Sequence, residues 1–175
     1  MRPARRAVAA TLLPLVAALS AGCGIRPTGV LDGGDAPSGL TKGMRLYFVS
    51  QTGRLEAVSR PDIPAYTATE PASIIKLLGA GPTESERASG LTTLLYRGNY
   101  EATVKGKSVT VRATDEYLDA TDVGDRNLAG QLVCSMARAQ AVGDTTGTTR
   151  TDDIRVTVSS LNGRMGIFVC SDFLK

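Results

Sequence analysis

The first 22 residues limit how much of this chain can belong to a folded domain. Three arginines within the first six residues precede a mostly apolar stretch of twelve, Val8–Leu19, which is followed by the small residues Ser20-Ala21-Gly22. A membrane-spanning helix takes about 20 apolar residues to cross the ~30 Å hydrocarbon layer, whereas the apolar core of a secretory signal takes 7–15. We therefore predict that residues 1–22 are an export signal and exclude them from the fold.

Cys23 follows this signal directly. Ser20-Ala21-Gly22-Cys23 resembles the lipobox of bacterial lipoproteins, although Leu19 lies four residues before the cysteine, where the family usually has leucine three before it. The resemblance implies cleavage before Cys23 and acylation of its thiol by chains such as palmitate, which would anchor the protein on the extracytoplasmic face of the cell membrane. An ordinary secretory signal with a chance cysteine is the alternative. Arg5-Arg6 leaves twin-arginine export open beside the general secretory route.

The segment after the cysteine has the composition of a flexible linker. Residues 24–43 hold six glycines and two prolines with few apolar side chains, so they cannot bury enough surface to fold. As a flexible chain they would span about 25 Å on average. We expect residues 23–43 to be a tether between the acylated cysteine and a single domain at 44–175.

Two features of composition exclude large classes of function. The chain of 175 residues has no histidine, which removes Ser-His-Asp and Cys-His nucleophiles and HExxH zinc sites. The net charge of +3 comes from the three arginines of the signal, and the remaining 17 basic residues equal the 17 acidic ones. A neutral body without a lysine and arginine run lacks the charge needed to bind nucleic acid.

Hydrophobic patterning predicts six short strands in three hairpins and two helices. A proline in the first turn and Gly79 at the end frame the first helix. The order β-β-α-β-β-α-β-β favours a single α+β domain, with two helices packed on a largely antiparallel sheet. The expected strands are 45–49, 55–59, 101–104, 108–113, 154–161 and 164–170, and the expected helices are 71–79 and 125–141.

The helix expected at 125–141 has a wide apolar face and a narrow polar stripe. Gln131, Ser135 and Arg138 form the stripe, which indicates that the helix is mostly buried. The last hairpin contains Asn162-Gly163, a strong turn signal. A two-residue turn there would pair Val158 with Ile167 and Val156 with Val169, giving one aliphatic face that packs on a helix.

Two short motifs resemble known catalytic or phosphate-binding patterns, and each has a simpler structural explanation. Ser73-Ile74-Ile75-Lys76 matches the SxxK of penicillin-recognising enzymes, but no SDN or KTG partner is present. Gly106-Lys107-Ser108 resembles the end of a phosphate-binding loop, but a strand hairpin replaces the required turn into a helix. Packing and turn formation account for both patterns.

A cluster of five carboxylates precedes the long helix. Their spacing does not fit a calcium-binding loop, so we interpret them as helix-capping and solvated turn residues, with a catalytic pair as the alternative. We predict no catalytic residue, metal or cofactor. The cluster consists of Asp115, Glu116, Asp119, Asp122 and Asp125.

Cys134 and Cys170 remain once Cys23 is assigned to lipidation. Two leftover cysteines in an exported domain usually form a disulfide. Against this, strand alternation places Cys170 away from the aliphatic face, and Cys134 flanks the polar stripe of its helix. The sequence leaves the pairing open.

The body of the chain resembles the GerMN domain of spore-germination and sporulation proteins and of actinobacterial envelope lipoproteins. The resemblance spans residues 44–170 and is most specific at Ile75–Thr83, a helix with a Gly-Pro-Thr turn, and at Gly90–Thr93. Further support comes from Leu46–Val49, Gly53–Leu55, Val58–Arg60, Val109–Val111 and Gln131–Val133. It implies a non-catalytic interaction module and brings no catalytic residues.

These observations lead to three hypotheses about function. The first is a membrane-anchored, non-enzymatic lipoprotein that binds another envelope protein or itself in cell-envelope or sporulation-related assembly. The second is a lipoprotein that binds a small ligand or a cell-wall glycan. The third is an enzyme that uses the acidic cluster.

Overall fold

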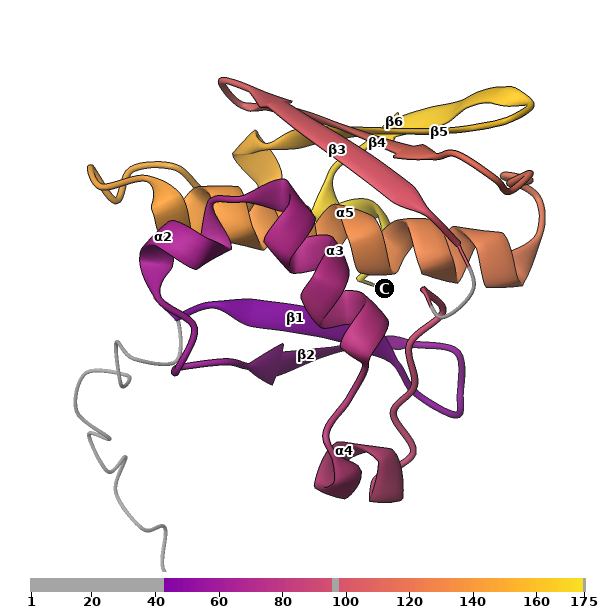
Figure 1. Cartoon of the computed structure of the whole chain (residues 1–175), viewed down its shortest axis with the longest axis horizontal. Coiled ribbons are helices and arrows are strands. Elements are labelled where there is room, and N and C mark those ends of the chain that lie inside the picture. Colours follow the sequence, from indigo (N-terminus) through magenta and orange to yellow (C-terminus); the bar gives the residue numbers. More distant parts are fainter. Residues whose placement is uncertain (1–42, 96–97, 175) are drawn as a thin grey trace, which may run out of the picture. The chain divides into compact units, whose positions relative to one another are not determined.

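The structure is a computed structural model that describes residues 43–95 and 98–174 (Figure 1). The predicted export signal, Cys23 and all of the predicted tether except Gly43 lie outside the described residues. Their roles therefore stay predictions.

The described residues confirm the α+β class, and the strands and the two expected helices lie close to the predicted positions. Two further short helices, at Ala65–Ala68 and Glu84–Ala88, were not predicted. Short 3₁₀ turns lie at Thr151–Asp153 and Cys170–Asp172. The strands are β1 (Arg45–Val49), β2 (Leu55–Ser59), β3 (Tyr100–Lys105), β4 (Ser108–Ala113), β5 (Arg155–Ser160) and β6 (Gly163–Phe168), and the helices are α2 (Ala65–Ala68), α3 (Pro71–Ala80), α4 (Glu84–Ala88) and α5 (Val123–Gly143).

The strands divide into two sheets, where the sequence predicted one. β1 and β2 form an antiparallel pair, and the other four strands form a mixed sheet in the order β3-β4-β5-β6. β4 and β5 run parallel because α5 connects them, and parallel neighbours need such a crossover. α5 lies between the two sheets, with α3 packed beside it (Figure 1).

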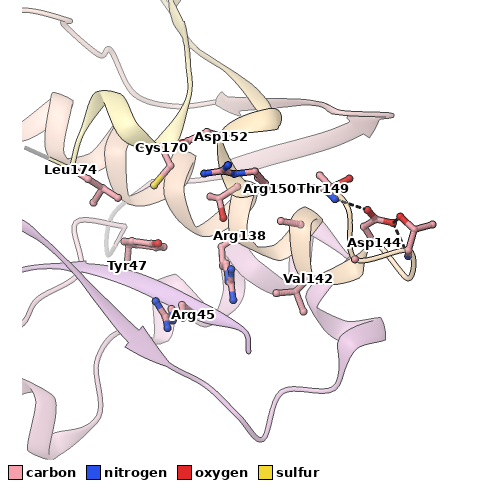
Figure 2. Close-up of a pocket in the computed structure, with 14 residues that line it drawn as sticks. Arg45, Tyr47, Arg138, Val142, Asp144, Thr149, Arg150, Asp152, Cys170 and Leu174 are labelled. Carbon is pink, nitrogen blue, oxygen red and sulfur yellow. Dashed lines mark hydrogen bonds between the residues drawn. The ribbon is translucent and has the colours of Figure 1, made fainter. Parts of the chain in front are cut away.

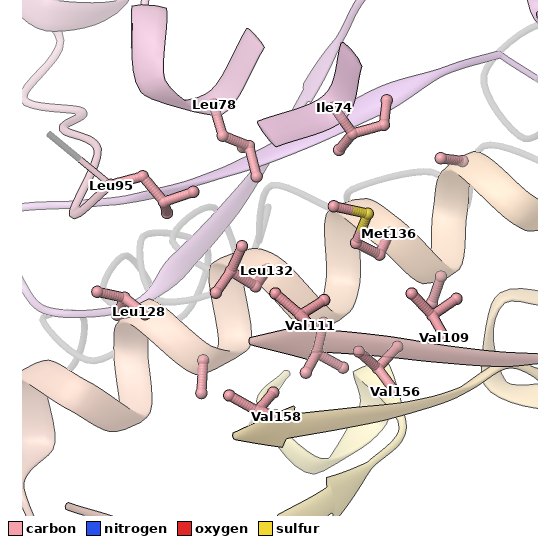
Figure 3. Packing of buried hydrophobic residues seen from close by; sticks show 14 of the residues in the cluster. Ile74, Leu78, Leu95, Val109, Val111, Leu128, Leu132, Met136, Val156 and Val158 are labelled. Carbon is pink, nitrogen blue, oxygen red and sulfur yellow. The ribbon is translucent and has the colours of Figure 1, made fainter. Parts of the chain in front are cut away.

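The core forms on the side of the four-stranded sheet that faces α5. Alternate residues of β4 and β5, among them Val111 and Val156, point inward against Leu132 and Met136 of α5 (Figure 3). Ile74 and Leu78 of α3 close the same cluster from the other side of the helix. The prediction that this helix is mostly buried is confirmed, since all but one of residues 128–139 are buried.

The predicted register of the last hairpin is wrong by one residue. Ser160 pairs with Gly163, so Leu161 and Asn162 form the loop, and a bulge follows Val158. Val156 therefore pairs with Phe168, not with Val169. A slip of one residue exchanges the two faces of a strand, and Ile167 consequently points outward with 54% of its surface exposed.

The first helix ends later than predicted. α3 continues through Gly79 to Ala80 and stops at Gly81, whose φ of +80° suits a residue without a side chain. Thr83 then begins α4 with a capping box, in which its hydroxyl accepts from the Glu86 N–H and the Glu86 carboxylate accepts from the Thr83 N–H.

Candidate functional site

A groove of about 860 Å³ opens between the start of β1, the C-terminal half of α5 and the segment 144–152 (Figure 2). Arg45 comes from β1, Arg138 from α5 and Arg150 from the segment that follows the helix. Arg45 is far from the other two arginines in the sequence, and the packing of β1 on α5 brings it to the same groove. This groove is our candidate functional site.

Arg138 lines the groove from α5 and lies near Arg45 (Figure 2). Its Nε and Nη2 both donate to the carbonyl oxygen of Gly43, at 3.0 and 2.7 Å, which ties the start of the domain to α5. Burial lowers the pKa of the Arg138 guanidinium, and the positive charge of Arg45 lowers it further. Two guanidinium groups thus lie close enough to repel one another.

The two acidic side chains that line the groove, Asp144 and Asp152, accept hydrogen bonds from nearby backbone N–H groups. The carboxylate of Asp144 accepts hydrogen bonds from the backbone N–H groups of Thr146 and Thr149, at 2.9 and 2.8 Å. Side-chain hydrogen bonds from Thr146 and Thr149, together with these backbone bonds, hold the pKa of Asp144 well below its usual range. Asp152 accepts from the backbone N–H of Ser171 at 3.0 Å. Both carboxylates therefore order the backbone around the groove.

Tyr47 supplies the buried aromatic wall of the groove. Burial raises the pKa of its phenol, while the charges of Arg138 and Arg45 act in the opposite direction. The hydroxyl is therefore protonated at neutral pH and able to donate a hydrogen bond.

Cys134 and Cys170 form a disulfide beside this wall, with an S–S distance of 2.02 Å. Strand alternation does not restrict Cys170, because β6 ends at Phe168 and Cys170 begins a 3₁₀ turn. That turn brings the sulfur to α5 between Tyr47 and Phe173. Both cysteines are almost fully buried, at 0% and 1% exposure, and the backbone of the C-terminal segment is thereby held at the groove.

The structure places the two weak catalytic motifs in ordinary structural positions. Ser73 lies in the first turn of α3, while Lys76 is exposed. Gly106 and Lys107 form the turn between β3 and β4, and Lys107 Nζ pairs with Asp153 at 3.3 Å. Neither motif contributes to the groove.

Four of the five predicted acids lie on the loop before α5 and the fifth, Asp125, lies in its first turn; all five accept hydrogen bonds from their neighbours. Asp122 caps α5 by accepting from the Asp125 N–H at 2.9 Å. Asp125 in turn accepts from the Asp119 N–H, and Asp119 from Thr121. Asp115 binds Asn99, and Glu116 accepts from the Tyr100 hydroxyl at 2.7 Å. Among the described residues, no group of His, Cys, Asp and Glu has the arrangement of a metal site.

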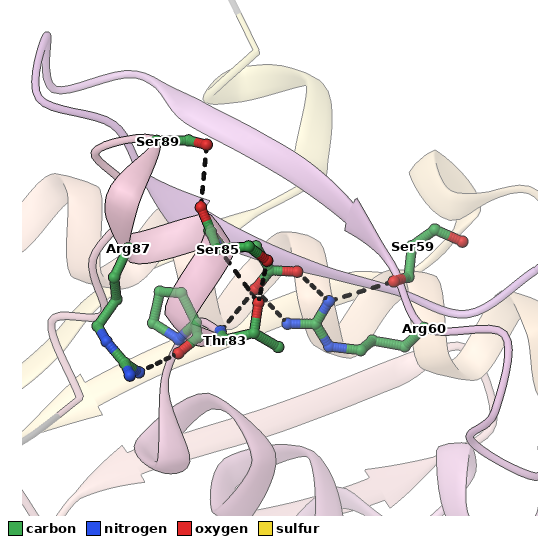
Figure 4. Close-up of polar contacts among 8 residues, drawn as sticks. Ser59, Arg60, Thr83, Ser85, Arg87 and Ser89 are labelled. Atoms are coloured by element: carbon green, nitrogen blue, oxygen red, sulfur yellow. Dashed lines mark hydrogen bonds and ion pairs between the residues drawn. The ribbon is translucent and has the colours of Figure 1, made fainter.

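The Gly-Pro-Thr turn and its surroundings form a compact polar cluster rather than a binding site (Figure 4). Arg60 binds Glu86 through two hydrogen bonds of 2.6 and 2.7 Å, and its guanidinium also lies over the Phe48 ring. Arg87 donates to the carbonyl of Pro82. The turn therefore joins α4 to the end of β2.

The Gly-Leu segment is held in the same structural manner. Thr92 forms an isolated antiparallel β-bridge with Val49 of β1. The Thr93 hydroxyl donates a hydrogen bond to the carbonyl of Leu78 near the end of α3. The residues that carry the GerMN resemblance thus connect secondary-structure elements.

The arginine groove was not predicted from the sequence. Arg138 appears there only as part of a polar stripe, and no pattern marks Arg45 or Arg150. The sequence contains no local signal for a site whose members lie on three separate elements.

Comparisons with known protein families, with curated protein sequences and with solved structures find no match to this chain. Within the described residues, no helix is both long and apolar enough to cross a membrane.

Proposed function

We propose that this protein is an exported lipoprotein, anchored to the extracytoplasmic face of the cell membrane through Cys23, whose folded part is a non-catalytic binding domain of the GerMN type. In this proposal the domain works in the cell envelope by contacting another envelope protein or a second copy of itself.

The buried Cys134–Cys170 disulfide carries the proposal. Disulfides form and persist outside the reducing cytosol, and here one links the longest helix to the end of the chain. An export signal and a disulfide are independent features that favour the same compartment. The predicted tether would then hold the domain at an average distance of about 25 Å from the anchor.

The arrangement of acidic side chains favours binding over catalysis. Asp115, Asp119 and Asp122 each accept hydrogen bonds that order the loop before α5. A general acid or base needs a carboxyl group that faces a substrate site, and none of these three lines the groove.

Membrane fractionation and intact-mass analysis of the mature protein test the anchor. Wild-type protein should partition with membranes and carry acyl chains on Cys23, whereas Cys23→Ala should be released or left unprocessed. Thr28→Ala, in the predicted tether, is the matched control and should behave as wild type. Equal partitioning and normal processing of Cys23→Ala would contradict the anchor.

The non-catalytic role has its own test in a strain that lacks the gene. Asp115→Asn and Asp119→Asn retain the size of each side chain and remove its charge, so they should complement the deletion as well as wild type does. Loss of complementation by a folded variant would favour the acidic cluster as a catalytic site.

A second candidate function is the binding of a small ligand or a cell-wall glycan. The observation that favours it is the groove with its three arginines and buried tyrosine. Concave sites with a few convergent polar groups are the usual form of small-molecule sites.

A further inference from the structure

The groove combines three arginines with two carboxylates that are already engaged. The described residues contain two ion pairs, Arg60–Glu86 and Lys107–Asp153, so neither Arg45 nor Arg150 forms one there. The positive charge of the groove is therefore not neutralised by Asp144 or Asp152 through direct pairing.

The arginines approach the groove from different sides. Arg45 and Arg138 lie close together on β1 and α5, and Arg150 extends from the loop segment above them (Figure 2). A planar guanidinium donates two parallel hydrogen bonds to a carboxylate or phosphate. An oxyanion seated among the three would relieve the repulsion between Arg45 and Arg138 and satisfy donors that have no carboxylate partner at Arg45 and Arg150.

The rest of the groove offers hydroxyl groups and space. Thr149 and Thr151 line it, and the side chain of Thr149 also hydrogen-bonds to the Asp144 carboxylate. Tyr47 adds a protonated phenol. About 860 Å³ lies within the ≈ 300–1,000 Å³ range of small-molecule sites and is far larger than a single phosphate needs.

We propose that this groove binds a hydroxylated small molecule that carries a phosphate or carboxylate group, with the oxyanion held by Arg45, Arg138 and Arg150 and the hydroxyls of the ligand facing Thr149 and Thr151. The inference rests on the second proposed function and adds the ligand class to it. It does not depend on the membrane anchor.

Calorimetric titration of the full chain in non-ionic detergent tests the proposal with four probes. Glucose 1-phosphate and glucuronate carry the two oxyanions on a hydroxylated ring, glucose lacks the charge, and inorganic phosphate lacks the ring. At least one of the charged sugars should bind more tightly than glucose and inorganic phosphate, and its affinity should fall as salt is added. The stronger of the two identifies phosphate or carboxylate as the source of the negative charge.

Arginine variants then locate the binding site. Arg45→Gln and Arg150→Gln should each weaken binding of the charged sugar about tenfold, since each removes a charge-assisted hydrogen-bond donor. Arg112→Gln makes the same change of charge on an exposed position of β4 outside the groove and should leave the affinity unchanged. Arg138 is kept, because it holds Gly43. Thermal unfolding of each variant verifies that it is folded.

Three results would overturn the proposal. The first is that neither charged sugar binds. The second is that glucose or inorganic phosphate binds as tightly as the charged sugars. The third is that Arg112→Gln weakens binding of the charged sugar as much as Arg45→Gln does. Each is distinguishable from failure of the membrane anchor, because Cys23→Ala should bind the charged sugar as well as wild type does.

Discussion

The backbone N–H of Tyr47 donates a 2.9 Å hydrogen bond to the hydroxyl of Ser135, 88 residues later in the chain. Tyr47 lies in β1, whose only strand partner along its full length is β2, so its other edge needs hydrogen-bond acceptors from elsewhere. Ser135 supplies one of them from α5, and Thr92 supplies another to Val49. The polar stripe of a buried helix thus completes the edge of a strand.

Gln131, one turn before Ser135, acts in the same way. Its side chain accepts from the Leu94 N–H at 2.9 Å and donates to the Thr93 hydroxyl at 3.1 Å, although the residue is fully buried. Polar side chains at 0% exposure are tolerated here because both of them are hydrogen-bonded.

Ser135→Ala should destabilise the domain by about 1–3 kcal/mol. The substitution leaves the buried Tyr47 N–H without an acceptor, and an unsatisfied buried donor costs that much. Urea unfolding measures the loss. Ser108→Ala, on an exposed strand position, should change stability by less than about 0.5 kcal/mol. Equal stability of the two variants would mean that the Ser135 bond contributes nothing.

Removal of the disulfide should cost about 3–4 kcal/mol. Cys134 and Cys170 are separated by 36 residues, and a cross-link over that distance restricts the unfolded chain by this amount in the chain-entropy account. The double variant Cys134→Ala with Cys170→Ala tests it by chemical unfolding. Reducing agent should destabilise the wild type to a similar extent and leave the double variant unaffected. A wild type whose stability does not change on reduction would contradict the disulfide between Cys134 and Cys170.

The register of the last hairpin predicts unequal costs for two truncations. Val156 is fully buried under α5, so Val156→Ala should destabilise by about 2 kcal/mol. Ile167→Ala should cost less than about 1 kcal/mol, because this side chain points outward. The two measurements use the same unfolding assay. A larger loss at Ile167 would favour the register that pairs it with Val158.

The Arg60–Glu86 ion pair should stabilise the folded domain at neutral pH and lose this effect at acid pH. The Arg60 side chain, through its hydrogen bonds, lowers the pKa of Glu86 below its ordinary 4.5, so the folded state favours the ionised carboxylate. This contribution is present above pH 4.5 and is lost as the pH falls through the lower pKa of the folded state.

Glu86→Gln isolates that charge, because glutamine also serves in a capping box. The difference in unfolding free energy between wild type and this variant should shrink as the pH falls from about 6 to about 3. Glu84→Gln removes a charge two residues away, in the same turn of α4, without breaking an ion pair and serves as the control. A difference that stays constant over this range would contradict the linkage.

Local patterns in the sequence determined most of the secondary structure. Hydrophobic patterning predicted β4 as one strand of a hairpin, and a proline with apolar spacing predicted α3. The wide apolar face with its polar stripe predicted the buried helix α5. These signals are reliable because each depends on neighbours within a few residues. The predictions of export and lipidation also rest on local sequence, in a segment that the structure does not describe.

Tertiary structure alone decided how these elements combine. The division into two sheets and the parallel pairing of β4 with β5 depend on which distant segments meet across α5. The groove has the same origin, since Arg45, Arg138 and Arg150 come from three elements. Periodicity along a chain reports which face of an element is buried, but the partner of that face is selected by packing over the whole domain, and the sequence carries no local signal for it.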